Sequence, residues 1–145
     1  MSDAGVILRP GETAGPYRIE RLLADAGLER VYLATTDDGA SVAVKVPRFE
    51  SSMDAELRRR FERQAETASR VAHPHLITVV RSGLLPSGAP FVAEEYMRGG
   101  SLQGMIARQP LDLAVAVRVC ADVAGGLDAL HAAGIIHRCL TPGCI

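Results

Sequence analysis

A tight turn between two apolar runs limits most strongly how this chain can fold. Residues 37–40 read DDGA, and they separate residues 30–36 (RVYLATT) from residues 41–48 (SVAVKVPR). An Asp-Gly pair accepts the positive φ values of the short turns that join antiparallel strands. A third run of the same kind, residues 17–23, precedes these two. The sequence therefore predicts a meander of three antiparallel strands.

The hydrophobic period changes after the meander. Apolar residues recur at steps of three and four over residues 51–72, which is the spacing of an amphipathic helix. Strand-like runs return at residues 73–80 and 90–97. Residues 98–102 (RGGSL) break the chain, a short helix is expected after them, and a long helical pattern runs from Leu113 to Ala133. This order of elements predicts an α+β fold. Residues 1–16 lack any periodicity and are expected to form a flexible leader.

Composition excludes several classes of partner. The chain has 145 residues, enough for one domain, and a formal net charge of -1, so no general attraction to nucleic acid or to an anionic membrane is expected. Charged residues interrupt the longest apolar stretch, residues 111–136, which argues against a membrane span. The N-terminus has no signal-peptide pattern, and three cysteines form no disulfide framework. A cytoplasmic location is therefore expected.

Five short motifs, taken in their order along the chain, indicate a protein family. They are RVYLA at 30–34, VAVK at 42–45, HPHLITVV at 73–80, EYMRGGSL at 95–102 and HAAGIIHR at 131–138. With them, the chain from Tyr17 to Ile145 resembles the N-terminal half of a bacterial, eukaryotic-like serine/threonine protein kinase. The resemblance implies a kinase N-lobe and hinge over residues 17–97, built from a five-stranded antiparallel sheet and one helix. It also implies the start of a C-lobe over residues 98–145, with one or two helices, so that the kinase domain is truncated.

The resemblance places altered residues in the flap that covers the phosphates of ATP in this family. The family pattern G-x-G-x-x-G-x-V is matched by ADAGLERV, so Ala24, Ala26 and Glu29 stand at the three glycine positions, while Val31 is kept. A Cβ atom hinders close approach of a phosphate to the backbone, and a carboxylate repels it. The same segment also reads as an ordinary hairpin turn.

Lys45 of VAVK corresponds to the lysine that contacts phosphates in active kinases, where a helix glutamate holds it. The matching helix position is Gln64, on the apolar stripe nine residues before His73. Glu62 and Glu66 lie about 160° around the helix from Gln64, so neither replaces the missing glutamate.

Glu94 occupies the position beside the adenine pocket where the family has a bulky apolar residue. A carboxylate is costly to bury there unless it is paired, and Lys45 on the neighbouring strand is the nearest expected cation. We hypothesise a Lys45–Glu94 pair that fills the pocket from inside. The alternative is a Glu94 that stays partly solvated.

The catalytic loop has also changed. The family's H-R-D-L-K-P-x-N is matched by HRCLTPGC at 137–144, so Cys139 replaces the catalytic Asp, Thr141 the Lys and Cys144 the magnesium-binding Asn. A thiol ionises with a higher pKa than a carboxylic acid and is a poor ligand for Mg²⁺. No competent catalytic residue and no bound Mg²⁺ are therefore expected.

Two other interpretations of these cysteines are weaker. A zinc site built from His131, His137, Cys139 and Cys144 has no recognised ligand spacing, so no metal is expected. A disulfide between Cys139 and Cys144 is disfavoured in a reducing compartment. We interpret both cysteines as small apolar fillers.

The sequence as a whole predicts an inactive, pseudokinase-like module that acts by protein interaction. At most weak ATP binding is expected, through Val31, Ala43, Lys45 and the hinge backbone from Glu95 to Met97. The alternatives are a serine/threonine protein kinase completed by another chain, and a non-functional gene remnant.

The long helix from Leu113 to Ala133 is the predicted interaction surface. It normally packs inside the second lobe of a kinase, so its apolar side chains would be exposed here. A protein partner or self-association is expected to cover them, and no nucleic-acid or membrane partner is expected.

Overall fold

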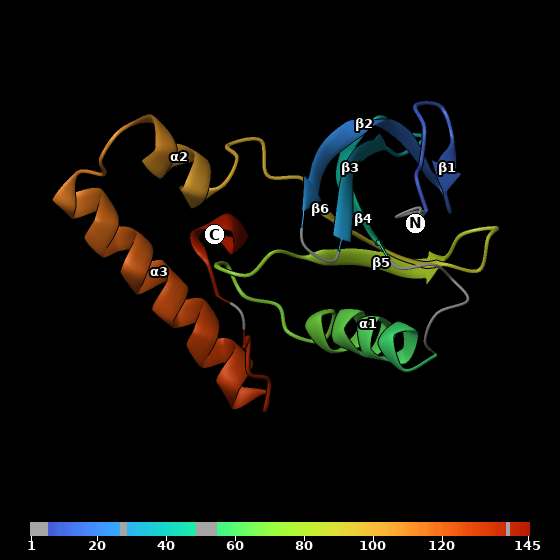
Figure 1. Ribbon diagram of the computed structural model, residues 1–145. Helices are drawn as coiled ribbons and strands as arrows, with labels where there is room; N and C mark the ends of the chain where they lie inside the picture. Colours follow the sequence, from blue (N-terminus) through green and yellow to red (C-terminus); the bar gives the residue numbers. More distant parts are fainter. Residues whose placement is uncertain (1–5, 27–28, 49–54, 139) are drawn as a thin grey trace. The chain divides into compact units, whose positions relative to one another are not determined.

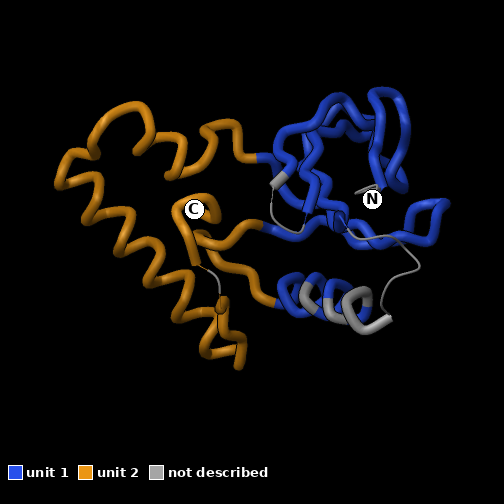
Figure 2. The backbone as a smooth tube through the Cα atoms, in the orientation of Figure 1, with its two compact units in different colours: residues 1–70, 78–96 blue, residues 71–77, 97–145 orange. Residues whose placement is uncertain are grey.

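The chain forms two structural units, seen in a computed structural model that describes residues 6–26, 29–48, 55–138 and 140–145 (Figure 1). The first unit comprises residues 1–70 and 78–96, and the second comprises residues 71–77 and 97–145 (Figure 2). The predicted boundary after the hinge at residue 97 thus falls one residue from the observed one, but a short segment before it also joins the second unit.

The first unit is built on an antiparallel sheet with the strand order β1-β2-β3-β4-β6-β5. Its strands are β1 (Thr13–Ala14), β2 (Tyr17–Ala26), β3 (Glu29–Thr35), β4 (Ser41–Pro47), β5 (Val79–Leu84) and β6 (Pro90–Glu95). The predicted meander is present as β2, β3 and β4, and Gly39 in the turn between β3 and β4 has the expected positive φ of 85°. The predicted α+β fold is confirmed, with one strand, β1, beyond the five that were expected.

The alternating burial of β3 and β4 separates the two faces of the sheet. The even-numbered residues from 30 to 34 and from 42 to 46 are buried. Most of them join the main core, together with Tyr17, Ile19 and Phe91. Ser41, Ala43 and Lys45 of β4 are half-buried and belong to the opposite face, because successive side chains of a strand alternate. Lys45 lies on this second face.

Helix α1 (Ala55–Ala68) packs on the face of the sheet that carries Lys45. Phe61 and Ala65 form a small core with Val92 of β6, and Val92 is the register partner of Lys45 on β4. Figure 1 shows α1 lying alongside β5, in agreement with its contacts to β5 and β6. The helix predicted from the period of 3.6 residues is therefore present, and its apolar side covers this face of the sheet.

The strand predicted over residues 73–80 begins only at Val79 and runs on to Leu84. The residues before it form a turn in which the Leu76 N–H donates to the His73 carbonyl at 3.0 Å. A Cβ on Gly126 would lie 2.8 Å from the His75 carbonyl oxygen, so this turn rests directly on the helix that contains Gly126. Leu76, one of the apolar residues that suggested a strand, packs on this helix instead, since its Cδ2 would lie 3.2 Å from a Cβ on Gly126.

The segment expected to be a flexible leader is attached to the sheet from Val6 onward. Val6 and Leu8 pack against the main core, and the Leu8 N–H donates to the Tyr32 hydroxyl at 3.1 Å. Ala14 in β1 is fully buried. The segment makes these contacts through isolated residues, so no periodic pattern marks them in the sequence.

The second unit contains α2 (Leu102–Arg108), α3 (Leu113–Ala132) and a 3-10 turn, η1 (Pro142–Cys144). Ser101 and Asp112 act as N-caps, with side-chain oxygens that accept from the N–H groups of Gly104 and Ala114. Among the described residues, no helix combines the length and the apolar character needed to cross a membrane.

Phe91 is expected to be a main contributor to stability in the first unit. It is 2% exposed and lies edge-on to the ring of Tyr17. Phe91→Ala should lower the free energy of unfolding by about 3–5 kcal/mol, because it leaves a cavity in the core. Urea denaturation measures the loss. Val80→Ala on the same sheet, at a side chain that is 51% exposed, should cost under about 1 kcal/mol, and equal losses in both variants would contradict the assignment of the core.

Candidate functional site

The strand register places Lys45 in a row of three residues across the sheet. Lys45 lies opposite Val31 on β3 and opposite Val92 on β6. In the next row, Ala43 lies between Leu33 and Glu94. Directly opposed residues share a face, so Lys45 and Glu94 are diagonal neighbours on one face and within reach of each other.

The two residues form an ion pair. The Lys45 Nζ lies 2.7 Å from the Glu94 Oε2, and the two side chains are 31% and 15% exposed. The structure thus brings together the lysine and the glutamate that the sequence analysis predicted to pair, and Glu94 is not left solvated. A partly buried ammonium that is already neutralised by a carboxylate attracts a phosphate less strongly.

Glu29 is a second carboxylate beside Lys45. It lies opposite Pro47, one step from the Val31–Lys45 pair on the same face, so it flanks Lys45 from β3 while Glu94 flanks it from β6. Burial raises the pKa of the Glu29 carboxyl, the Lys45 ammonium works against this rise, and the Glu94 carboxylate adds to it. Two carboxylates therefore act on one ammonium.

The flap strands are held by a charge network that the sequence analysis missed. The Asp25 carboxylate accepts from the Arg30 Nε at 3.2 Å and forms an ion pair with Arg48, whose Nε also lies at 3.2 Å. Arg30 is only 4% exposed, and its Nη1 donates to the Val6 carbonyl at 3.2 Å. Asp25 and Arg30 are register partners on β2 and β3, so the pairing of these two strands brings them together.

The three glycine positions of the flap lie on the β2–β3 hairpin. Ala24 pairs with Val31, and Ala26 pairs with Glu29, while residues 27 and 28 lie outside the described residues. The segment is thus a strand hairpin in which Ala24 and Glu29 carry side chains where the family pattern has glycines. This agrees with both interpretations of the flap, an altered phosphate cover and an ordinary turn.

On α1, the glutamates that flank the missing partner of Lys45 are directed elsewhere. The Glu66 carboxylate accepts from Arg70 at 2.6 Å on the exposed side of the helix. Glu62 lines a cavity between α1 and the strands β5 and β6. The backbone of Gln64 belongs to α1, but its side chain lies outside the described residues.

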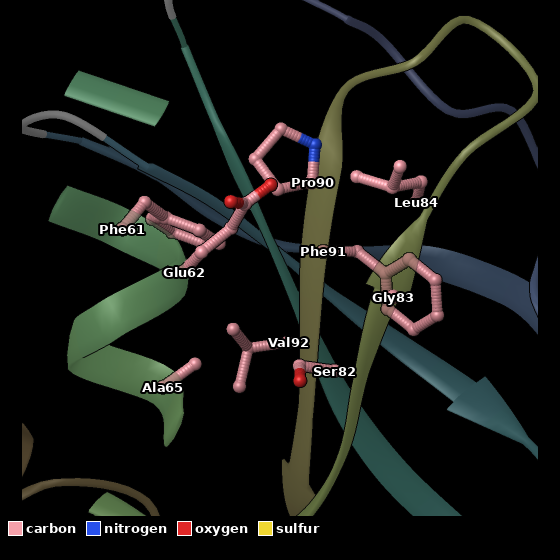
Figure 3. A pocket seen from close by; sticks show the side chains of 9 residues that line it. All are labelled: Phe61, Glu62, Ala65, Ser82, Gly83, Leu84, Pro90, Phe91 and Val92. Carbon is pink, nitrogen blue, oxygen red and sulfur yellow. The ribbon is translucent and has the colours of Figure 1, made fainter. Parts of the chain in front are cut away.

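The cavity beside α1 has a volume of about 210 Å³ (Figure 3). Phe61 and Ala65 line it from α1, and Val92 lines it from β6 (Figure 3). None of the predicted binding residues lines it, so it is distinct from the Lys45–Glu94 pair.

The hinge backbone is partly occupied by bonds within the protein. The Glu95 N–H donates to the Thr78 carbonyl at 3.0 Å, and the Glu95 carboxylate accepts from the Thr78 N–H at 2.7 Å. Met97, the first hinge residue in the second unit, accepts at its carbonyl from the Gly100 N–H at 3.3 Å. Fewer hinge groups are therefore open to a ligand than the sequence suggested.

The catalytic-loop positions lie in the second unit. Thr141 is the N-cap residue of η1, and its Oγ1 lies 3.3 Å from the Cys144 Sγ. Cys139 lies outside the described residues. Within the part of the chain that the structure describes, no three His, Cys, Asp or Glu side chains are placed to hold a metal ion.

Comparison with known proteins decides the family. The sequence profile of the family described as protein tyrosine and serine/threonine kinase matches residues 18–142. The chain belongs to this family.

Its relatives within the kinase family include bacterial serine/threonine-protein kinases. The chain is 36% identical to PknJ of Mycobacterium tuberculosis over 93% of its length, and 38% identical to pkn3 of Myxococcus xanthus over 87%. It spans 23% of each of these two relatives. Among solved structures, it matches the kinase domain of Mycobacterium tuberculosis PknI with a TM-score of 0.80 and 33% identity, covering 94% of this chain and 56% of that one. The predicted resemblance is confirmed.

Membership of the kinase family allows each site residue of this chain to be compared with the family pattern. The retained parts are the sheet, α1 and the lysine on β4, while Glu94 and Glu29 are carboxylates placed on either side of that lysine. What the sequence analysis missed is Glu29 as a neighbour of Lys45. It had assigned Glu29 only to the flap, although the alternation of β3 places it on the Lys45 face.

Glu29 should lower stability at neutral pH. A raised pKa means that the folded protein holds this proton more tightly than the unfolded chain, so its favourable contribution is complete below the ordinary pKa of 4.5 and is lost as the pH rises through the raised value. Glu29→Gln should therefore raise the thermal midpoint by about 2 °C at pH 7.5, and the gain should shrink towards pH 4.

Thermal unfolding followed by circular dichroism between pH 4 and 8 measures this difference. Glu20→Gln, at an exposed position of β2, is the matched control and should show no such dependence. A wild-type protein that is more stable than Glu29→Gln at pH 7.5 would contradict the assignment.

Proposed function

We propose that the chain is a catalytically inactive, pseudokinase-like module that binds ATP at most weakly and acts through protein interaction. The observation that carries this proposal is the Lys45–Glu94 ion pair, with 2.7 Å between Nζ and Oε2. In active kinases a helix glutamate holds this lysine where it contacts the phosphates. Here Glu94 on the neighbouring strand β6 holds Lys45 instead, at the position beside the adenine pocket where the family has a bulky apolar residue.

The catalytic-loop positions support the same proposal. In active kinases an Asp accepts the proton of the substrate hydroxyl and an Asn binds Mg²⁺. Here the Asn position holds the thiol of Cys144, and sulfur is a poor ligand for Mg²⁺. The neighbouring Thr141 hydroxyl, whose Oγ1 lies 3.3 Å from the Cys144 Sγ, is not a carboxylate that could accept the substrate proton. Cys139 at the Asp position would have to lose its proton first, at a higher pKa than a carboxyl. No Mg²⁺-dependent transfer is therefore proposed.

Residual nucleotide binding would use the apolar part of the sheet. Val31 and Ala43 are half-buried on the Lys45 face and would cover an adenine ring. The hinge from Glu95 to Met97 would supply hydrogen bonds, but the Glu95 N–H and the Met97 carbonyl are already engaged within the protein. Weak binding without Mg²⁺ follows from this combination.

The interaction surface would lie on the second unit. Several large apolar side chains of its helices are exposed, among them Leu113 at 77% and Val117 at 60%. Exposed apolar surface of this kind on α3 favours contact with a protein, or with a second copy of the chain, over nucleic acid or membrane. A cytoplasmic location remains part of the proposal.

A second candidate function is a serine/threonine protein kinase that another chain completes. Two observations favour it: the relatives are serine/threonine-protein kinases, and the chain covers 56% of the PknI kinase domain. The added polypeptide would have to supply the proton acceptor and metal ligands and to displace Glu94 from Lys45.

An assay of phosphate transfer and a thermal shift with ATP separate the two candidates. The wild-type chain at millimolar ATP should show a midpoint shift below about 1 °C, since stabilisation grows as RT ln(1 + [L]/Kd), and no labelled phosphate on a general acceptor protein, with or without Mg²⁺.

Lys45→Ala is the control variant for this experiment and should behave as the wild type does. An Mg²⁺-dependent transfer of phosphate that Lys45→Ala abolishes would overturn the proposed function and favour the active kinase.

A further inference from the structure

Lys45 is flanked by carboxylates from both neighbouring strands. Glu29 lies two residues along β3 from Val31, which is opposite Lys45. Glu94 lies two residues along β6 from Val92, the other residue opposite Lys45. The three charges interact with one another: the Lys45 ammonium lowers the pKa of the Glu29 carboxyl, and the Glu94 carboxylate raises it. The three side chains form a cluster on one face of one sheet.

The net charge of this cluster is negative, whereas a polyphosphate binds to positive charge. Two ionised carboxylates and one ammonium leave a net negative charge at the lysine end of the face. Arg30 does not compensate, since it is buried on the opposite face and paired with Asp25. A ligand with several negative charges would therefore meet repulsion where active kinases supply attraction.

The adjacent part of the same face is apolar and uncharged. Val31 and Ala43 are half-buried on the Lys45 face, with Leu33 beside them at 8% exposure. A flat neutral ring could contact these side chains without placing any charge near Glu29 or Glu94. The apolar part of the face thus favours a neutral ring, and the charged part disfavours a ligand with several negative charges.

We propose that Glu29, together with Glu94, is a specificity-determining residue that makes this site select a neutral nucleoside over its polyphosphate. The inference rests on the proposed function, because it requires Lys45 to be held by Glu94. Glu29 supplies the excess charge, and Glu94 supplies the neutralisation of the lysine. Removing one acid restores a balanced site, and removing both leaves a free ammonium.

The experiment compares adenosine with ATP in the absence of Mg²⁺. Isothermal titration of the full chain gives Kd values for the wild type, Glu29→Gln, Glu94→Gln and the double variant, with Glu20→Gln as the control. We expect ATP affinity to rise about tenfold in each single variant and further in the double variant, while adenosine affinity stays within about twofold. The Glu20→Gln protein should match the wild type.

Salt provides a second test that needs no variant. If net repulsion acts on the phosphates, ATP binding by the wild type should strengthen relative to adenosine as ionic strength rises, since salt screens the carboxylates. An attractive lysine site predicts the opposite sign. Equal ATP affinity in all variants, no binding of either ligand to the double variant, or a fall of ATP binding with salt would overturn the inference.

Failure of this inference and failure of the proposed function have different signatures. Phosphate transfer by the wild-type chain would overturn the proposed function whatever the ligand preference. ATP affinity that is unchanged by Glu29→Gln, in a protein that transfers no phosphate, would overturn only the role of Glu29.

Discussion

The ion pair between Lys45 and Glu94 is the interaction on which the account of this protein depends. It joins β4 and β6, neighbouring strands near the middle of the sheet, by a contact of 2.7 Å between Nζ and Oε2. Burying either charge alone would be costly, so each residue requires the other. In active kinases a helix glutamate holds the matching lysine, whereas here its partner is a glutamate on the neighbouring strand.

The fold does not depend on that chemistry. Tyr32, Phe91 and the valines of β4 form the core on one face of the sheet, whereas Lys45, Glu29 and Glu94 lie on the other. Stability comes mainly from apolar burial, so residues of the second face can change without loss of the core. This separation explains how a chain can match the PknI kinase domain with a TM-score of 0.80 while its site residues differ from the family pattern.

Much of the fold and part of the site could be predicted from the sequence, for identifiable reasons. Local signals such as the Asp-Gly turn predicted the meander, and counting from motifs predicted that Lys45 and Glu94 would meet. Strand β1 and the start of β5 at Val79 could not be predicted, because tertiary packing decides them. The bridge from Asp25 to Arg30 and the closeness of Glu29 to Lys45 require the register across strands, which one sequence does not reveal.

A double-mutant cycle on Lys45 and Glu94 tests the central claim most directly. The free energy of unfolding is measured by urea denaturation for the wild type, Lys45→Met, Glu94→Gln and the double variant. The account predicts a favourable coupling of about 1 kcal/mol, because the pair is partly buried and close. Additive effects of the two substitutions, with coupling below about 0.3 kcal/mol, would show that Lys45 is not held by Glu94 and would contradict the account.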